Sequence, residues 1–500
     1  TYVEDYIEQY RDYSTGLALA VIKDDETVYK KYYGKSDIAN NIDVSDESVF
    51  EWGSVSKLFV WTSVMQLYEK KKIDLNSDIR TYLPKKFLTK LNYNKKITML
   101  NLMNHNAGWQ EITAEGVIEE DGSKVENLAE FLKKNEPVQV YKPGEVCSYS
   151  NWGTTLAALI VERVSGKSYS DYVHKNILEP LKMKHTSILD DYSDNNWVRT
   201  QMQYNKGYYL AFDESEMPIF DENGKNIFNE VKHYQIALYP AGAVTGTLDD
   251  FIKFAKEFTK DEKSVLFKKC KTMDKFLSSS LNYENSDINR ISHGLWTIEC
   301  KNQLLGHYGN TTTNSSGLMF DTKTDTAYVV MTNQASEKVY NYIMLDMIFG
   351  TVNQRELINE QNFIDTNIVA GNYLDSRIQY NNYDSEEFAN DYSINVSSFT
   401  DDRVLCINDI FSQYEPGFFV SDLLNWSFFY TEDTSGYGKI NFYTEDLLNY
   451  NYIQDIMTNV EFTDFSDINE NIFDEKIINK FILKDLKKHK DKCKYRNIVN

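Results

Sequence analysis

Apolar residues along the first 350 positions follow two spacings, one typical of strands and one of helices. Short apolar or alternating runs bounded by Gly, Asn or Asp predict strands over 16–22, 27–33, 296–299, 303–305, 316–320 and 327–332. Longer stretches with helical spacing predict helices over 3–11, 55–70, 152–164, 169–177 and 248–258. This order predicts an α+β fold, in which an antiparallel sheet is flanked by helices and carries an inserted, mostly helical lobe.

The pattern changes beyond about residue 350. Strand-like pieces at 404–407, 418–420 and 439–443 precede a predicted closing helix at 475–490. Residues 351–500 hold 13 basic and 26 acidic side chains, so more than half of the chain's net charge of -22 lies there. We therefore predict two domains, a large one over 1–350 and a smaller, acidic, aromatic-rich and mostly β domain over 351–500.

The composition excludes several classes of protein. A net charge of -22 and a pI near 4.8 argue against nucleic-acid binding, which needs a basic surface. No apolar run reaches the 18 residues of a membrane span, and because the sequence opens at Thr1 we expect that a signal, anchor or tag has been removed. The five cysteines show no zinc-ligand spacing with the seven histidines, so we expect neither a metal nor a disulfide framework. The cysteines are Cys147, Cys270, Cys300, Cys406 and Cys493.

A first candidate for chemistry is Ser54-Val55-Ser56-Lys57, which follows Gly53 at the start of an apolar helix. Residues three apart share a helix face, so the Lys57 amine can reach the Ser54 hydroxyl, and burial would favour the neutral, basic amine. The helix start also supplies a backbone N–H for an oxyanion. The alternative is that Ser54 caps the helix and Lys57 is solvated.

A second candidate is Tyr149-Ser150-Asn151, at the junction between a Pro-Gly loop and a helix. There a tyrosine could share a proton with Ser54, and the Asn151 amide could hold a substrate carbonyl. The alternative is that Asn151 caps the helix and Tyr149 packs in the core.

A third candidate is His307-Tyr308-Gly309, followed by Asn310, at the end of a strand. A glycine on such a strand lets a substrate backbone approach and pair along its edge. His307 could supply a hydrogen bond or a charge to a substrate carboxylate, and the alternative is a structural histidine.

Together these three motifs resemble the serine β-lactamase and penicillin-binding-protein superfamily, which carries S-x-x-K, Y-x-N and K-T-G or H-x-G in this order. The intervening sequence resembles it too, over most of residues 10–340. The similar stretches are Leu102 to Gly108, with His105 as a structural histidine, Glu179-Pro180-Leu181-Lys182-Met183, and Pro240-Ala241-Gly242 through Asp250.

The resemblance implies roles for the matching residues. Ser54 would be acylated, Lys57 and Tyr149 would relay protons, and Asn151 would orient the substrate. The backbone N–H groups of Ser54 and Asn310 would form the oxyanion hole. His307 stands where many β-lactamases carry Lys, which matches instead the D-aminopeptidase, esterase and some carboxypeptidase branches. No cofactor is implied.

The C-terminal part more weakly resembles a β domain of exported bacterial relatives, through Val369-Ala370-Gly371-Asn372-Tyr373 and Glu415-Pro416-Gly417-Phe418-Phe419. The resemblance implies an extracellular or cell-envelope location, with attachment to the wall or membrane through a removed anchor. A cytoplasmic location is the alternative.

These observations leave three functional hypotheses. The first is a serine hydrolase that forms an acyl-enzyme on a D-amino-acid-containing peptide or a small acyl ester. The second is a catalytically silent protein that binds peptidoglycan or peptide in the same groove. The third is a β-lactamase or an acyltransferase.

Overall fold

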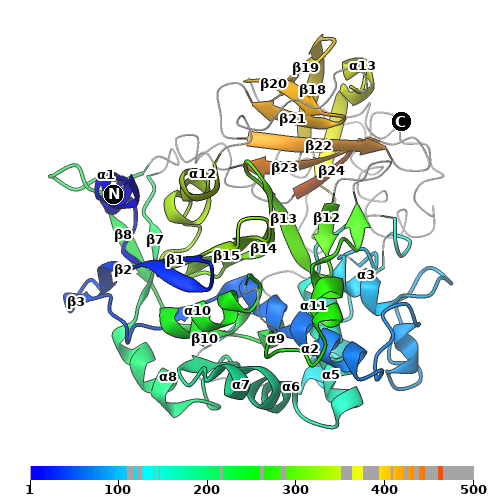
Figure 1. Ribbon diagram of the computed structural model, residues 1–500, viewed down its shortest axis with the longest axis horizontal. Coiled ribbons are helices and arrows are strands. Elements are labelled where there is room, and N and C mark those ends of the chain that lie inside the picture. The colour runs from blue at the N-terminus through cyan, green and yellow to red at the C-terminus, as the bar shows by residue number, and fades with distance from the viewer. Residues whose placement is uncertain are drawn as a thin grey trace.

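The computed structural model of the chain describes residues 2–109, 118–120, 127–139, 141–145, 147–213, 218–259, 264–282, 289–350, 363–375, 393–406, 409–421, 426–432, 438–444 and 460–464. Within these ranges it shows a helix-flanked sheet and, above it in Figure 1, a separate group of strands from the last third of the chain.

The main sheet has nine antiparallel strands in the order β11-β12-β13-β14-β15-β16-β1-β2-β3. It joins the two ends of the large domain, because β1 pairs with β16 over seven positions, from Leu17 opposite Thr332 to Lys23 opposite Thr326. The strands are β1 (Gly16–Lys23), β2 (Glu26–Asp37), β3 (Ile42–Asp43), β11 (Leu281–Asn282), β12 (Asn289–Ser292), β13 (Leu295–Glu299), β14 (Gln303–Asn310), β15 (Ser315–Asp321) and β16 (Thr326–Thr332).

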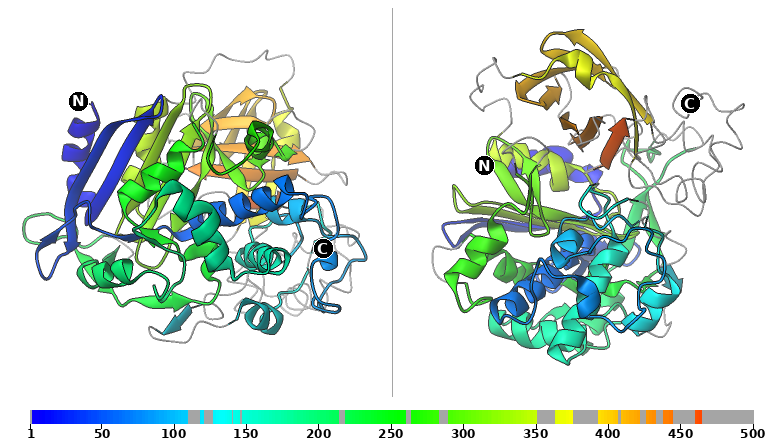
Figure 2. Two further views of the ribbon diagram at one scale, coloured as in Figure 1. Left: turned by 60° about the horizontal axis from the view of Figure 1, so that its bottom comes forward. Right: turned by 90° about the vertical axis from the view of Figure 1, so that its right-hand side faces the viewer.

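Helices cover both faces of this sheet (Figures 1 and 2). On one face α1 (Tyr2–Tyr10), the π-helix η7 (Val339–Ile343) and α12 (Met344–Phe349) pack around buried Leu19, Met319 and Tyr328. The other face meets α2 (Lys57–Glu69), α5 (Asn151–Ser165) and α10 (Leu248–Lys256). Strands β15 and β16 are buried along their whole length because both faces are covered.

The segment between β3 and β11 forms the helical lobe. Its remaining helices are the short 3-10 helices η2 (Gly53–Ser56), η3 (Ile79–Thr81) and η6 (Met202–Tyr204), the π-helix η5 (His174–Leu178), α3 (Met99–Met103), α4 (Leu128–Lys134), α6 (Tyr169–Val173), α7 (Glu179–Leu181), α8 (Asn196–Gln201), α9 (Tyr239–Gly242) and α11 (Cys270–Leu277). The 3-10 helix η1 (Arg11–Tyr13) follows α1. Short strands tie the lobe together: β4 (Phe50–Glu51), β10 (Thr245–Gly246) and β6 (Thr186–Ser187) form one sheet, β5 (Ile118–Glu120) pairs with β9 (Tyr234–Ile236), and β7 (Gly207–Leu210) pairs with β8 (Phe228–Val231).

The C-terminal strands close into a barrel, because the first of them, β17, pairs with both β18 and the last, β24. Buried aromatic side chains such as Tyr373, Phe411, Phe419 and Phe428 fill its core. The elements are α13 (Thr366–Val369), β17 (Gly371–Asp375), β18 (Ser393–Thr400), β19 (Arg403–Cys406), β20 (Asp409–Glu415), β21 (Phe418–Ser421), β22 (Trp426–Glu432), β23 (Gly438–Thr444) and β24 (Val460–Asp464).

The predicted fold class is confirmed: the chain has an antiparallel sheet with flanking helices, a helical insertion and a β-rich C-terminal region. The predicted helix over 475–490 lies outside the described residues, as does Cys493. The other four cysteines, which lie in the described ranges, form no disulfide there. Among the described residues, no helix is long and apolar enough to cross a membrane.

Candidate active site

Ser54 and Lys57 lie where the short strand β4 turns into helix α2. Gly53 makes this turn with a φ of +49°, a backbone conformation that favours glycine, and one turn of 3-10 helix carries Ser54 before α2 begins at Lys57. The Lys57 side chain is fully buried, and its Nζ donates a hydrogen bond to Ser54 Oγ at 2.9 Å. Nucleophile and base candidates are therefore already in contact.

Two further acceptors hold the Lys57 amine. Its Nζ donates to Asn151 Oδ1 at 2.6 Å and to the backbone carbonyl of Ala241 at 2.8 Å. A solvated Lys57 is therefore wrong. A capping role for Ser54 is wrong as well, because neither η2 nor α2 has a side-chain cap.

The Tyr149-Ser150-Asn151 motif forms the start of α5. Ser150, rather than Asn151, caps this helix by accepting a hydrogen bond from the Gly153 N–H at 2.9 Å, so the capping alternative for Asn151 is wrong. The Asn151 amide oxygen is thereby turned to Lys57. Tyr149 is half-buried, and Lys57 Nζ lies 4.8 Å from the centre of its ring. The two motifs, almost 100 residues apart in sequence, thus meet at the lysine amine.

The third motif approaches Ser54 through the backbone of β14. Strand β13 pairs with β14 only up to Gly306, and beyond it the end of β14 pairs with β15. A Cβ at Gly53 would lie 2.7 Å from the Asn310 nitrogen, and a Cβ at Gly309 would lie 2.1 Å from the Trp52 carbonyl oxygen. Both glycines are needed for this close approach, which brings the backbone nitrogen of Asn310 beside the turn that carries Ser54.

The side chain of Asn310 is held by Ser315, which lies opposite it on β15. Ser315 Oγ donates to Asn310 Oδ1 at 2.6 Å and accepts a hydrogen bond from the Glu337 N–H at 3.0 Å. This contact fixes the residue whose N–H the resemblance assigns to the oxyanion hole.

His307 is buried beside Tyr149, with the two ring centres 6.2 Å apart. Burial, with a smaller contribution from the Lys57 charge, lowers the pKa of His307 to about 3. The imidazole is therefore neutral near pH 7. Of the two roles considered from the sequence, a hydrogen bond remains and a charge for a substrate carboxylate does not.

Sequence reasoning missed several parts of this site. The Ala241 carbonyl that holds Lys57 is a backbone group and leaves no mark in residue type, although it lies inside the recognised Pro240-Ala241-Gly242 stretch. Trp296 also escaped notice; its ring stacks on His105 with the centres 5.7 Å apart and lies 6.3 Å from that of Tyr149.

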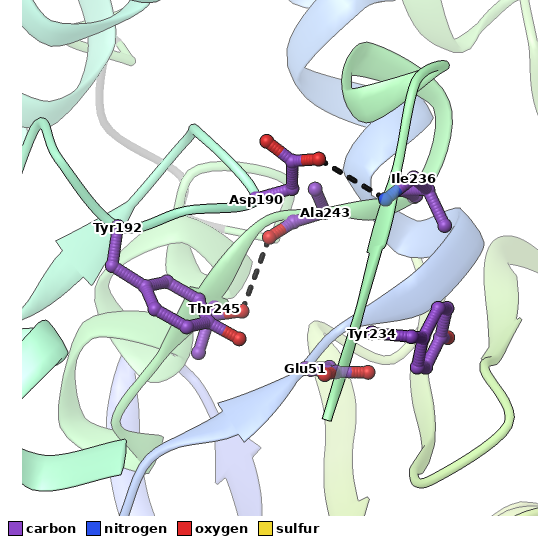
Figure 3. Close-up of a pocket in the computed structure, with 8 residues that line it drawn as sticks. Glu51, Asp190, Tyr192, Tyr234, Ile236, Ala243 and Thr245 are labelled. Carbon is purple, nitrogen blue, oxygen red and sulfur yellow. Dashed lines mark hydrogen bonds between the residues drawn. The ribbon is translucent and has the colours of Figure 1, made fainter. Parts of the chain in front are cut away.

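A small pocket lies beside Gly242 and Ala243, which follow Ala241 in the sequence (Figure 3). It is lined by Glu51, Asp190, Tyr192, Tyr234, Ile236, Gly242, Ala243 and Thr245. Asp190 accepts a hydrogen bond from the Ile236 N–H at 3.0 Å, so this carboxylate fastens the wall of the pocket. Within the described part of the chain, no group of three or more His, Cys, Asp or Glu side chains could hold a metal ion.

A comparison with models of known families shows which family the chain belongs to. The sequence model of the family named Beta-lactamase matches residues 3–345, more than half of the chain. The chain belongs to the beta-lactamase family. That family model spans all three motifs, from Ser54 to Asn310.

The chain is similar to both curated proteins and solved structures. The protein flp of Staphylococcus aureus (strain N315) is 26% identical over 328 residues, which are 65% of this chain and 60% of flp. The chain therefore matches only about three fifths of the length of this curated relative. An octameric penicillin-binding protein homologue from Pyrococcus abyssi has a TM-score of 0.54 and 18% identity, covering 93% of this chain and 98% of the homologue. The D-amino acid amidase from Ochrobactrum anthropi SV3 has a TM-score of 0.55 and 20% identity, covering 71% and 98%. At these identities the solved structures show a shared fold.

Proposed function

We propose that the chain is a serine hydrolase that cleaves an amide or ester through an acyl-enzyme on Ser54. The observation that carries this proposal is the fully buried Lys57, whose Nζ lies 2.9 Å from Ser54 Oγ and is held by Asn151 and Ala241. Burying an amine is costly unless its hydrogen bonds are satisfied. A lysine arranged in this way beside a serine hydroxyl is suited to activating it.

Acylation requires the neutral amine of Lys57, in which Nζ keeps its two hydrogen bonds to Asn151 and Ala241 and turns its lone pair to the Ser54 hydroxyl. The Ser54 proton passes to Lys57, with Tyr149 beside it, as Ser54 Oγ attacks the substrate carbonyl carbon. The carbonyl oxygen becomes an oxyanion, which the N–H groups of Ser54 and Asn310 stabilise. The C–N or C–O bond then breaks, and the leaving amine or alcohol takes the proton back.

Deacylation repeats these steps with water as the nucleophile. Water loses a proton to the same basic groups and attacks the acyl carbon, a second oxyanion forms, and Ser54 Oγ leaves and regains its proton. The products are a carboxylic acid and free enzyme, so no cofactor takes part.

A D-amino-acid-containing peptide or amide, or a small acyl ester, is the substrate class that we propose. Support comes from the shared fold with a D-amino acid amidase and from His307, which is neutral where a β-lactamase commonly carries Lys. We further propose that the enzyme acts in the cell envelope or outside the cell, as the family resemblance implies.

A substrate panel tests this proposal. D- and L-amino acid p-nitroanilides, p-nitrophenyl esters and a chromogenic cephalosporin are offered to the wild type, to Ser54→Ala and to Ser63→Ala, whose lost hydroxyl donates only to the Phe59 carbonyl. We expect hydrolysis of a D-anilide or an ester by the wild type and Ser63→Ala, and none by Ser54→Ala. Binding of these compounds without turnover would instead indicate the silent binding protein.

A further inference from the structure

Two buried histidines lie next to Tyr149. The ring centre of His105 lies 4.5 Å from that of Tyr149, and the ring centre of His307 lies 6.2 Å from it. Both side chains are more than nine-tenths buried. The proton that each neutral ring carries therefore decides what the walls of the site offer to a substrate.

Backbone contacts fix the two rings as opposite tautomers. The Ser150 N–H donates to His105 Nδ1 at 3.1 Å, so Nδ1 is the acceptor and Nε2 carries the proton. His307 Nδ1 lies 2.5 Å from the carbonyl oxygen of Tyr308, which can only accept, so here Nδ1 carries the proton. His307 Nε2 is left with a lone pair.

Among the residues that the structure describes, this lone pair has no hydrogen-bond partner. His307 Nε2 is enclosed and unbonded, on the side of β14 that faces Lys57 and Tyr149. A buried acceptor without a donor is unfavourable, so binding is strengthened when a donor reaches it. The Tyr308 hydroxyl is not the donor for this lone pair, because the Tyr308 ring stacks instead on that of Tyr342, with the ring centres 4.0 Å apart.

We propose that His307 Nε2 accepts a hydrogen bond from an N–H or O–H group of the substrate, so that the site selects a neutral donor such as a carboxamide over a free carboxylate. The inference rests on the proposed function for the nature of the substrate. His307 and Asn310 are three residues apart on a strand, roughly 10 Å. The selected group therefore belongs to a residue beside the scissile bond.

A free carboxylate is disfavoured because both it and His307 Nε2 are hydrogen-bond acceptors. A carboxylate has only lone pairs to present, and it would meet the lone pair of Nε2 after losing its water. A carboxamide in the same place offers two N–H groups. Sites that bind one member of such a pair by a buried hydrogen bond reject the other strongly.

The first test reads the tautomer directly and needs no activity. Long-range 1H–15N correlation spectra are recorded on the 15N-labelled full chain from pH 5 to pH 8, and His307→Gln assigns the signals. We expect His307 to remain neutral with a protonated Nδ1 over this range. A protonated Nε2, or an imidazolium above pH 5, would overturn the proposal whatever the enzyme does.

The second test reads selectivity. Ser54→Ala, which cannot be acylated, is titrated with N-acetyl-D-alanyl-D-alanine and with its C-terminal amide, which differ only at the terminal group. We expect the amide to bind at least tenfold more tightly, and His307→Lys in the same background to shift the ratio toward the carboxylate at least tenfold. Equal binding, tighter binding of the carboxylate, or no binding of either would overturn the proposal.

The two tests fail separately from the proposed function. If Ser54 proves not to be a nucleophile, the tautomer and the binding ratio can still be measured, because neither needs turnover. If Ser54 is acylated but the carboxylate peptide binds better, the hydrolase stands and the role of His307 falls.

Discussion

At the scale of single residues, one buried amine connects the motifs. Lys57 Nζ donates to Ser54 Oγ, Asn151 Oδ1 and the Ala241 carbonyl, three groups that are distant in sequence. The sequence predicted the contact with Ser54, because residues three apart share a helix face. It assigned Asn151 to the substrate and not to the lysine amine. It could not predict Ala241, because any residue supplies a carbonyl and only the path of the backbone brings this one to the lysine.

Replacing this lysine tests its role. Lys57→Met keeps the length of the side chain and removes its amine, so we expect kcat/KM to fall by about 10²–10⁴, the usual contribution of a general base. Lys133→Met is the matched control, because Lys133 is an exposed residue of α4. Steady-state kinetics measure both variants, and equal activity of Lys57→Met and the wild type would contradict a base at this position.

At the scale of elements, strand β14 is five residues longer than its prediction. The apolar pattern predicts a strand over 303–305, whereas β14 continues to Asn310 through the whole third motif. His307, Gly309 and Asn310 interrupt the apolar run, but pairing with β15 keeps them extended. Tertiary pairing thus overrides local preference, as is common at functional strands.

Gly53 and β14 together set the distance on which the proposed oxyanion hole depends. Gly53→Ala would place a Cβ 2.7 Å from the Asn310 nitrogen at a φ of +49°, so the turn or the strand must shift. We expect kcat to fall by at least about tenfold, because a misplaced oxyanion donor lowers the rate by about 10- to 10³-fold. Gly166→Ala is the control, since its φ of +73° carries similar strain but no atom lies within 4 Å of the added Cβ.

The two glycine variants separate strain from site geometry. Both should lower the free energy of unfolding by about 1 kcal/mol or more, measured by urea denaturation. Only Gly53→Ala should lower kcat. An unaffected kcat in Gly53→Ala would show that Asn310 need not approach Ser54 so closely.

At the scale of the whole molecule, the sequence predicted the layers of the fold but not the closure of its last part. Alternating runs at 404–407, 418–420 and 439–443 predicted a β-rich region, and these became β19, β21 and β23. The barrel closes through pairing of β17 with β24, for example Tyr373 opposite Asp464. Such long-range pairing has no signal in a local pattern.

Buried neutral histidines make the stability of the fold depend on pH. Burial lowers the pKa of His105 well below 6.5, that of His293 to about 4 and that of His307 to about 3. Below pH 6.5 the unfolded chain takes up protons that the fold refuses, so this stability is present above pH 6.5 and is lost as the pH falls. Burial also raises the pKa of Glu337 to about 7, which opposes the trend between pH 7 and 4.5.

We expect the net effect of these four groups to be about two protons, on the order of 3 kcal/mol per pH unit between pH 6.5 and 4.5. Urea denaturation at several pH values measures it. His293→Gln should make the slope less steep by about one proton, since one titrating group is removed. A free energy of unfolding that stays constant from pH 7 to pH 5 would contradict buried neutral histidines.

The central claim is that Ser54 is the nucleophile, and intact-mass analysis after reaction with a fluorophosphonate tests it most directly. The account predicts one covalent adduct on the wild type and on Ser63→Ala, and no adduct on Ser54→Ala. An adduct that persists in Ser54→Ala would place the nucleophile elsewhere. A wild type that stays unmodified would contradict an activated serine at position 54.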